Sequence, residues 1–114
     1  RLLQTYEGLH QTIRYDAVSL DLETNVMHYA EQELQFPETE AKILSVLLSK
    51  APAVVSQDQL FKAVWGDSPY WDENLLQVNI SRIRKNLDSL GLAGALTTVR
   101  GKGYAWRPEQ MEES

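Results

Sequence analysis

Cysteine is absent from the 114-residue chain, and histidine occurs only as His10 and His28. The chain therefore contains no disulfide and no thiolate ligand for a metal ion. Neither histidine has a second metal ligand at a suitable spacing, so we expect no metal site and interpret His28 as a surface residue. The lack of cysteine also favours an intracellular protein.

Long apolar runs are missing as well. No stretch reaches the about 18 consecutive apolar residues that a membrane-spanning helix needs. We expect a soluble, cytoplasmic segment that makes no direct contact with a membrane.

Arrangements of residues typical of an enzyme are also missing. The sequence shows no Ser/His/Asp set and no cluster of metal ligands, and Gly101-Lys-Gly103 lacks the strand–loop–helix context of a nucleotide-binding loop. We therefore expect neither catalysis nor a cofactor.

The length and the 43% hydrophobic content suit one small domain with a single core. The chain begins with Arg1 and without a charged-then-apolar leader, which favours a fragment of a longer protein. We expect residues 1–11 to be a linker or frayed end, residues 12–107 to form the domain, and residues 108–114 to be an acidic flexible tail.

Positive charge is scarce overall, because the net charge is −5, and it is unevenly distributed. Residues 74–107 contain six Lys and Arg against one Asp, whereas residues 1–73 contain five against twelve acidic residues. A basic segment of this kind is often only a solvated helix face, but it also suits a nucleic-acid partner. The elements that carry these bases decide between the two interpretations.

The N-terminal third alternates apolar and polar residues in short runs, at 18–22, 26–29 and 34–36. Such a period of two predicts a small antiparallel meander with turns at Glu23–Asn25 and Glu31–Glu33. Its polar face would meet water, and its apolar face would pack on the rest of the domain.

Two helices are predicted to follow. The first covers Glu38–Lys50, with Pro37 suited to its first turn. The second begins at Ser56-Gln-Asp-Gln59, which fits a capping box, and ends at Gly66. A loop then contains Asp67, Ser68, Pro69, Tyr70 and Trp71; its aromatic residues either form a partner surface or fold back into the core.

A third helix, predicted from Glu73 to about Leu90, has an apolar stripe that must be buried. The stripe consists of Leu76, Ile80, Ile83, Leu87 and Leu90. At 100° per residue, the opposite face carries Asn74, Val78, Ser81, Arg82 and Lys85, with Asn79 and Arg84 on its flanks. Amide, hydroxyl and guanidinium groups on such a face match DNA bases and phosphates. Val78 would touch a thymine methyl group or cover the neighbouring loop.

The last predicted element is a β-hairpin. Two β-prone runs, Leu96–Arg100 and Tyr104–Trp106, flank Gly101-Lys-Gly103, which predicts a tight turn with a basic tip. Placed after an amphipathic basic helix, this hairpin has the position of a wing.

Several of these motifs together resemble the winged-helix effector domain of OmpR/PhoB-type response regulators. They are Glu40 early in the first helix, Val55-Ser56 to Leu60, Trp65-Gly66, Leu76-Gln-Val-Asn-Ile-Ser-Arg-Ile-Arg-Lys-Asn-Leu87, and Thr98 to Tyr104. Asp72-Glu-Asn74 followed by Val78-Asn79 further resembles the subgroup that responds to antimicrobial peptides such as bacitracin. The resemblance implies an α+β winged helix-turn-helix with an N-terminal β-meander, three helices and a C-terminal hairpin wing.

This resemblance implies sequence-specific binding of double-stranded DNA. The third helix would enter the major groove and the wing the minor groove, and residues 67–71 would face RNA polymerase. We expect phosphate contacts from Arg84, Lys85, Thr98 and Lys102, base contacts from Asn79, Ser81 and Arg82, and wing contacts from Arg100 and Tyr104. Family members usually offer Ser or Thr where Pro37 stands, and often histidine and arginine where Asn79 and Ser81 stand.

The resemblance also implies how the longer protein is built. We expect two copies on direct-repeat half-sites, forming a dimer on the DNA, and a preceding receiver domain that receives its signal from a sensor kinase. Two alternatives stay open: a cytoplasmic DNA-binding domain of a membrane-anchored one-component regulator, and a winged-helix protein-interaction module that does not bind DNA.

Overall fold

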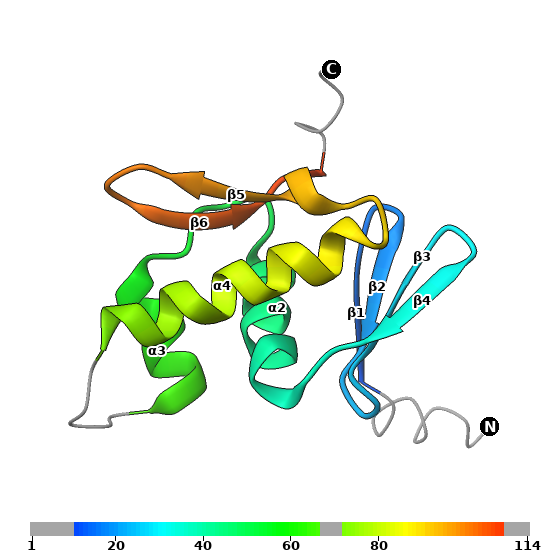
Figure 1. Ribbon diagram of the computed structural model, residues 1–114, viewed down its shortest axis with the longest axis horizontal. Coiled ribbons are helices and arrows are strands. Elements are labelled where there is room, and N and C mark those ends of the chain that lie inside the picture. Colours follow the sequence, from blue (N-terminus) through cyan, green and yellow to red (C-terminus); the bar gives the residue numbers. More distant parts are fainter. Residues whose placement is uncertain (1–10, 67–71, 109–114) are drawn as a thin grey trace.

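A computed structural model describes residues 11–66 and 72–108 (Figure 1). Its elements are β1 (Thr12–Tyr15), β2 (Val18–Asp21), β3 (Val26–Tyr29), β4 (Gln32–Gln35), α2 (Glu38–Lys50), α3 (Gln57–Trp65), α4 (Glu73–Asp88), the 3₁₀ helix η1 (Ala93–Ala95), β5 (Leu96–Val99) and β6 (Gly103–Trp106). This order confirms the predicted winged-helix architecture, although η1 was not expected.

Strands β1 to β4 form an antiparallel sheet in sequence order. Its core side includes Val18, Leu20 and Met27, which are almost fully buried, while His28 is exposed. The predicted turn at Glu31–Glu33 is displaced: the turn is at Ala30–Glu31, and β4 already begins at Gln32. Ala30 adopts a positive φ of 60°, so the chain reverses at once, and Glu33 lies in β4 opposite His28.

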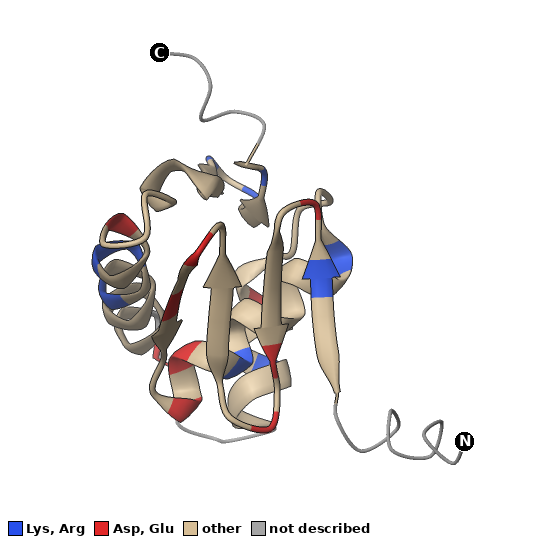
Figure 2. Ribbon diagram, turned by 90° about the vertical axis from the view of Figure 1, so that its right-hand side faces the viewer, with Lys and Arg blue, Asp and Glu red and all other residues tan. Residues whose placement is uncertain are grey.

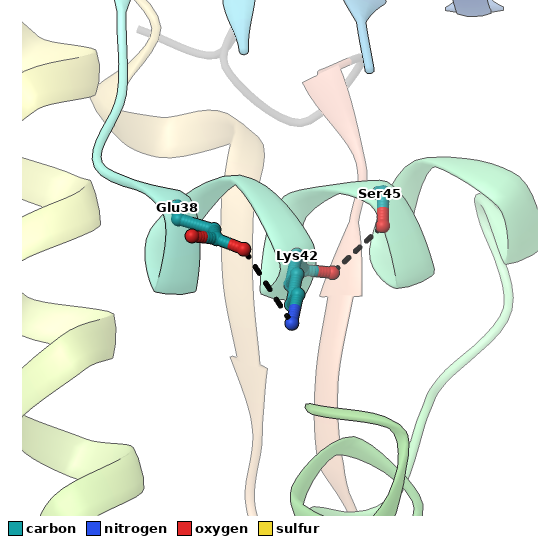
Figure 3. Close-up of polar contacts among 3 residues, drawn as sticks. All are labelled: Glu38, Lys42 and Ser45. Carbon is teal, nitrogen blue, oxygen red and sulfur yellow. Dashed lines mark hydrogen bonds and ion pairs between the residues drawn. The ribbon is translucent and has the colours of Figure 1, made fainter. Parts of the chain in front are cut away.

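Helix α2 packs against the sheet with its apolar side and leaves a polar side open (Figures 1 and 3). On the polar side, Lys42 Nζ lies 3.8 Å from Glu38 Oε2, and Ser45 Oγ donates to the carbonyl oxygen of Lys42 at 2.8 Å. Pro37 is the N-cap rather than a residue of the first turn, and its side chain accepts no hydrogen bond, unlike the Ser or Thr usual at this place in the family. The first turn of α2 therefore lacks a side-chain cap.

Helix α3 begins with the predicted capping box. Ser56 Oγ accepts from Gln59 N at 3.1 Å, and Gln59 Oε1 accepts from Ser56 N at 3.1 Å. The helix ends before Gly66, which has a positive φ of 69°. No helix among residues 11–66 and 72–108 is long and apolar enough to cross a membrane.

The hairpin β5–β6 is attached to the connection between α2 and α3. Val55 and Tyr104 exchange two backbone hydrogen bonds of 2.8 and 3.0 Å. Gly103 begins β6 and was predicted to lie in the turn; a Cβ built on it would lie 2.1 Å from the carbonyl oxygen of Val55. Only glycine allows this close approach, which fixes one strand of the wing.

Candidate nucleic-acid interface

Helix α4 is oriented by its apolar stripe. Asp72 caps its N-terminus by accepting from Asn74 N at 3.0 Å. All five predicted stripe residues are buried: Leu76, Ile80, Ile83, Leu87 and Leu90. The helix ends at Asp88 rather than Leu90, because the chain leaves it through a turn that gives Gly91 a φ of 79°.

Polar contacts also hold α4 in place. Asn86 Nδ2 donates to Glu40 Oε1 of α2 at 2.9 Å, and the Glu40 residue is only 4% exposed. Just after the same, C-terminal end of α4, Gln32 Nε2 of β4 donates to the carbonyl oxygen of Leu90 at 3.1 Å. The sheet and α2 thus fix which side of α4 faces outward.

The outward side of α4 carries the residues that the sequence placed there. Asn74, Ser81, Arg82 and Lys85 are exposed, and Val78 is 45% exposed. Within the described part of the chain, neither Arg82 nor Lys85 has a hydrogen bond or ion pair. Two cations are therefore available to an external partner.

Asn79 does not lie on that exposed side. It is 7% exposed, and its Nδ2 donates to the carbonyl oxygen of Leu75 at 2.9 Å, one turn back along the helix. A short side chain beside a buried stripe is easily covered by its surroundings, which a helical projection cannot show. We therefore leave Asn79 out of the group of base-contacting residues proposed below.

Arg84 and Thr98 meet each other. Arg84 Nη2 donates to Thr98 Oγ1 at 2.6 Å and to the carbonyl oxygen of Leu96 at 3.1 Å. These bonds tie the side of α4 to strand β5 of the hairpin. The sequence predicted two separate phosphate contacts, whereas the structure pairs the two side chains.

The wing turn is basic and open to solvent. Arg100, Gly101 and Lys102 are exposed, and Lys102 N donates to the carbonyl oxygen of Val99 at 2.8 Å to close the turn. In Figure 1 the turn points toward the end where α4 begins. Tyr104 belongs to the wing, as expected, but it is only 6% exposed.

The charges are distributed unevenly over the molecule. Figure 2 shows most Asp and Glu on the four-stranded sheet, its turns and α2, while α4 and the hairpin carry mainly Lys and Arg; β1 and α2 also carry basic residues. Residues 74–107, which form most of α4 and the wing, contain six Lys and Arg against one Asp, so the net charge of −5 comes from the rest of the sequence. The α4–wing segment is therefore the part of the chain that suits a negatively charged partner.

Leu75, near the start of α4, is a large apolar residue that is 38% exposed, and the sequence analysis did not predict this. Its position directly before the buried Leu76 could have indicated that it lies outside the apolar stripe. The predicted loop of Asp67, Ser68, Pro69, Tyr70 and Trp71 lies outside the described residues, as do most of the predicted linker and tail.

Comparison with known proteins agrees with this geometry. The family described as "Transcriptional regulatory protein, C terminal" matches residues 31–106. The phosphate regulon transcriptional regulatory protein PhoB of Rhizobium meliloti is 35% identical over 99 residues, which cover 87% of this chain and 44% of that protein.

Two solved structures have a similar fold. The C-terminal domain of the nisin resistance regulator NsrR, a lantibiotic response regulator, superposes with a TM-score of 0.73 at 32% identity, covering 84% of this chain and 96% of that domain. The Klebsiella pneumoniae RstA DNA-binding domain, solved in complex with the RstA box, gives 0.72 at 26% identity, covering 87% and 99%.

The architecture defines a winged-helix domain of the kind found in transcription regulators. The chain belongs to the family of C-terminal domains of transcriptional regulatory proteins, the OmpR/PhoB type. It spans between 38% and 44% of the length of the first three curated relatives that it matches.

Proposed function

We propose that this domain binds double-stranded DNA in a sequence-specific manner, as the output domain of a transcription regulator. The observation that carries the proposal is the pairing of two basic elements. Arg82 and Lys85 on α4, and Arg100 and Lys102 in the wing turn, are exposed, and their side chains have no hydrogen bond or ion pair among the described residues. A helix and a hairpin tip together suit two adjacent grooves of a duplex.

The contacts divide into positioning and reading. Lys85, Lys102 and the hydroxyl of Thr98 contact phosphates, because all three are exposed on the outer side of α4 and the wing. Ser81 and Arg82 contact base edges in the major groove, where an arginine bound bidentately to guanine supplies about 1–3 kcal/mol of discrimination. Arg100 enters the minor groove, and Tyr104 holds β6 in place.

Relatives support the regulatory setting of this proposal. The match covers only 42% and 44% of the length of the response regulator GraR and of PhoB, so these relatives contain a further segment besides this domain. We place the domain in the cytoplasm, after a receiver domain that a sensor kinase controls, with two copies on direct-repeat half-sites and residues 67–71 toward RNA polymerase. The 32% identity to NsrR supports a regulator that responds to antimicrobial peptides.

Selection from a random pool of duplexes tests the proposal. The domain is expected to enrich one motif of a few base pairs, and its affinity is expected to fall steeply with salt, by a logarithmic slope of about −0.9 per neutralised phosphate. A chain that enriches no sequence and binds no duplex at low salt is not a DNA-binding domain. That result would favour the protein-interaction module, with the acidic sheet as its contact surface.

A further inference from the structure

Arg84 of α4 donates hydrogen bonds to strand β5 of the wing. Its side chain is half-buried on the flank of α4 that faces β5. Nε and Nη2 both donate to the carbonyl oxygen of Leu96, at 3.4 and 3.1 Å, and Nη2 also donates to Thr98 Oγ1 at 2.6 Å. One side chain of α4 therefore makes three hydrogen bonds to a single strand of the wing.

These bonds occupy a group that every bidentate contact with DNA would use, and leave only Nη1 without a partner in the described part of the chain. A guanidinium binds a phosphate or a guanine bidentately through either of two N–H pairs, Nε with Nη2 or Nη1 with Nη2. Both pairs contain Nη2, and its two hydrogens face two acceptors of β5. Lys85, the next residue, is exposed and has no partner in the described part of the chain.

We propose that Arg84 is a positioning residue, which fixes the wing relative to α4 and does not itself contact DNA. This inference rests on the proposed DNA binding. Two elements that contact two grooves at once bind more tightly when their separation is already fixed, because less conformational entropy is lost on binding. Arg84 fixes β5, while the close approach of Gly103 to Val55 fixes β6. Thr98 accepts from Arg84 and keeps its own O–H to donate to a phosphate.

A double-mutant cycle separates positioning from direct contact. The affinity for the selected duplex is measured for Arg84→Gln, for a variant with both Arg100→Gln and Lys102→Gln, and for their combination. Arg84→Gln is expected to weaken binding about tenfold in the native background. It should change binding less than about threefold once the wing charges are gone, since the hydroxyl of Thr98 is then the one proposed wing contact left to position.

Lys85→Gln is the matched control, because it removes a neighbouring cation that contacts a phosphate directly. It is expected to cost the same factor in both backgrounds. If Arg84→Gln also costs the same factor in both, the proposal is overturned, whether the loss comes from a direct contact or from partial unfolding.

A second measurement needs no DNA. The amide of Lys102 donates to Val99 across the wing turn, so its hydrogen exchange reports how often this end of the hairpin opens, which we expect to increase when β5 is no longer tied to α4. Arg84→Gln and Thr98→Val are expected to speed this exchange about fivefold or more, and Lys85→Gln to leave it unchanged. Unchanged exchange in both variants would overturn the proposal. If the native domain bound no duplex, the proposed function would be refuted. The exchange measurement would still show whether Arg84 holds the wing against α4.

Discussion

The side-chain amide of Asn86 on α4 donates to the buried carboxylate of Glu40 on α2, at 2.9 Å. Asn86 directly follows Lys85, so this bond ties the part of α4 that carries the exposed bases to the buried side of α2. Asn86→Ala would leave the carboxylate of Glu40 without this donor in an almost fully buried place. We expect the free energy of unfolding to fall by about 2 kcal/mol in urea denaturation, the usual cost of an unsatisfied buried polar group.

Ser89→Ala is the control for that variant. Ser89 is exposed just after α4, and its hydroxyl donates only to the local carbonyl oxygen of Asn86, at 2.7 Å. Its loss should change the stability by less than about 0.5 kcal/mol. Equal effects of the two variants would mean that the contact between Glu40 and Asn86 contributes nothing of its own.

Gly103 and Gly101 offer a matched pair in the wing. Both have positive φ angles, of 149° and 74°, but only a Cβ at Gly103 meets the backbone of Val55. Gly103→Ala is expected to lower the free energy of unfolding by about 2–3 kcal/mol and to weaken DNA binding, because β6 must move away from Val55. Gly101→Ala should cost about 1 kcal/mol, from its backbone conformation alone. Calorimetry measures the stability of both variants. A larger loss of stability for Gly101→Ala than for Gly103→Ala would contradict the importance given to the close approach of Gly103 to Val55.

The missing side-chain cap of α2 predicts a difference in stability between two substitutions of Pro37. Pro37 has an extended backbone and accepts no side-chain hydrogen bond, so a serine there would supply an acceptor for the first turn. Pro37→Ser is expected to be about 1 kcal/mol more stable than Pro37→Ala in urea denaturation. Because both variants remove the proline ring, the comparison isolates the hydroxyl. Equal midpoints for the two would show that the first turn of α2 is satisfied without a cap.

The sequence predicted the elements well because their signals are local. The capping box of α3 and the apolar stripe of α4 depend on residues within a few turns, and the structure has both. The turn near Ala30 was misplaced because charged residues also occur in exposed strands. Local signals thus fixed the helices better than the turns.

The candidate site was harder to predict, since its geometry depends on tertiary contacts. A helical projection places Asn79 and Arg84 beside the exposed face, yet Asn79 is buried and Arg84 is bonded to the wing. Neither outcome follows from spacing along α4. The need for glycine at position 103 likewise comes from Val55, nearly fifty positions earlier in the chain. What the sequence did predict at the site is the pair of exposed basic elements.

Arg82 and Lys102 should differ in what their loss does to DNA binding. Arg82→Ala is expected to cost about 1–3 kcal/mol on the selected duplex and little on a random one, because it removes a base contact. Lys102→Ala should weaken both duplexes alike and reduce the salt slope by about 0.9, because it removes a phosphate contact. Titrations by fluorescence anisotropy at several salt concentrations measure both quantities. If both variants lost affinity equally on both duplexes, the assignment of a base contact to Arg82 and a phosphate contact to Lys102 would be wrong.

The most direct test of the account is to map where a duplex touches the domain. Backbone amide shifts of the isotope-labelled protein would be followed by NMR during titration with the selected duplex at low salt. We predict the largest changes along the exposed side of α4, from Asn74 to Lys85, and in the wing from Thr98 to Gly103, with β1 to β4 nearly unchanged. Changes centred on the four-stranded sheet, or none on α4 and the wing, would contradict the claim that these two elements form the DNA-binding surface.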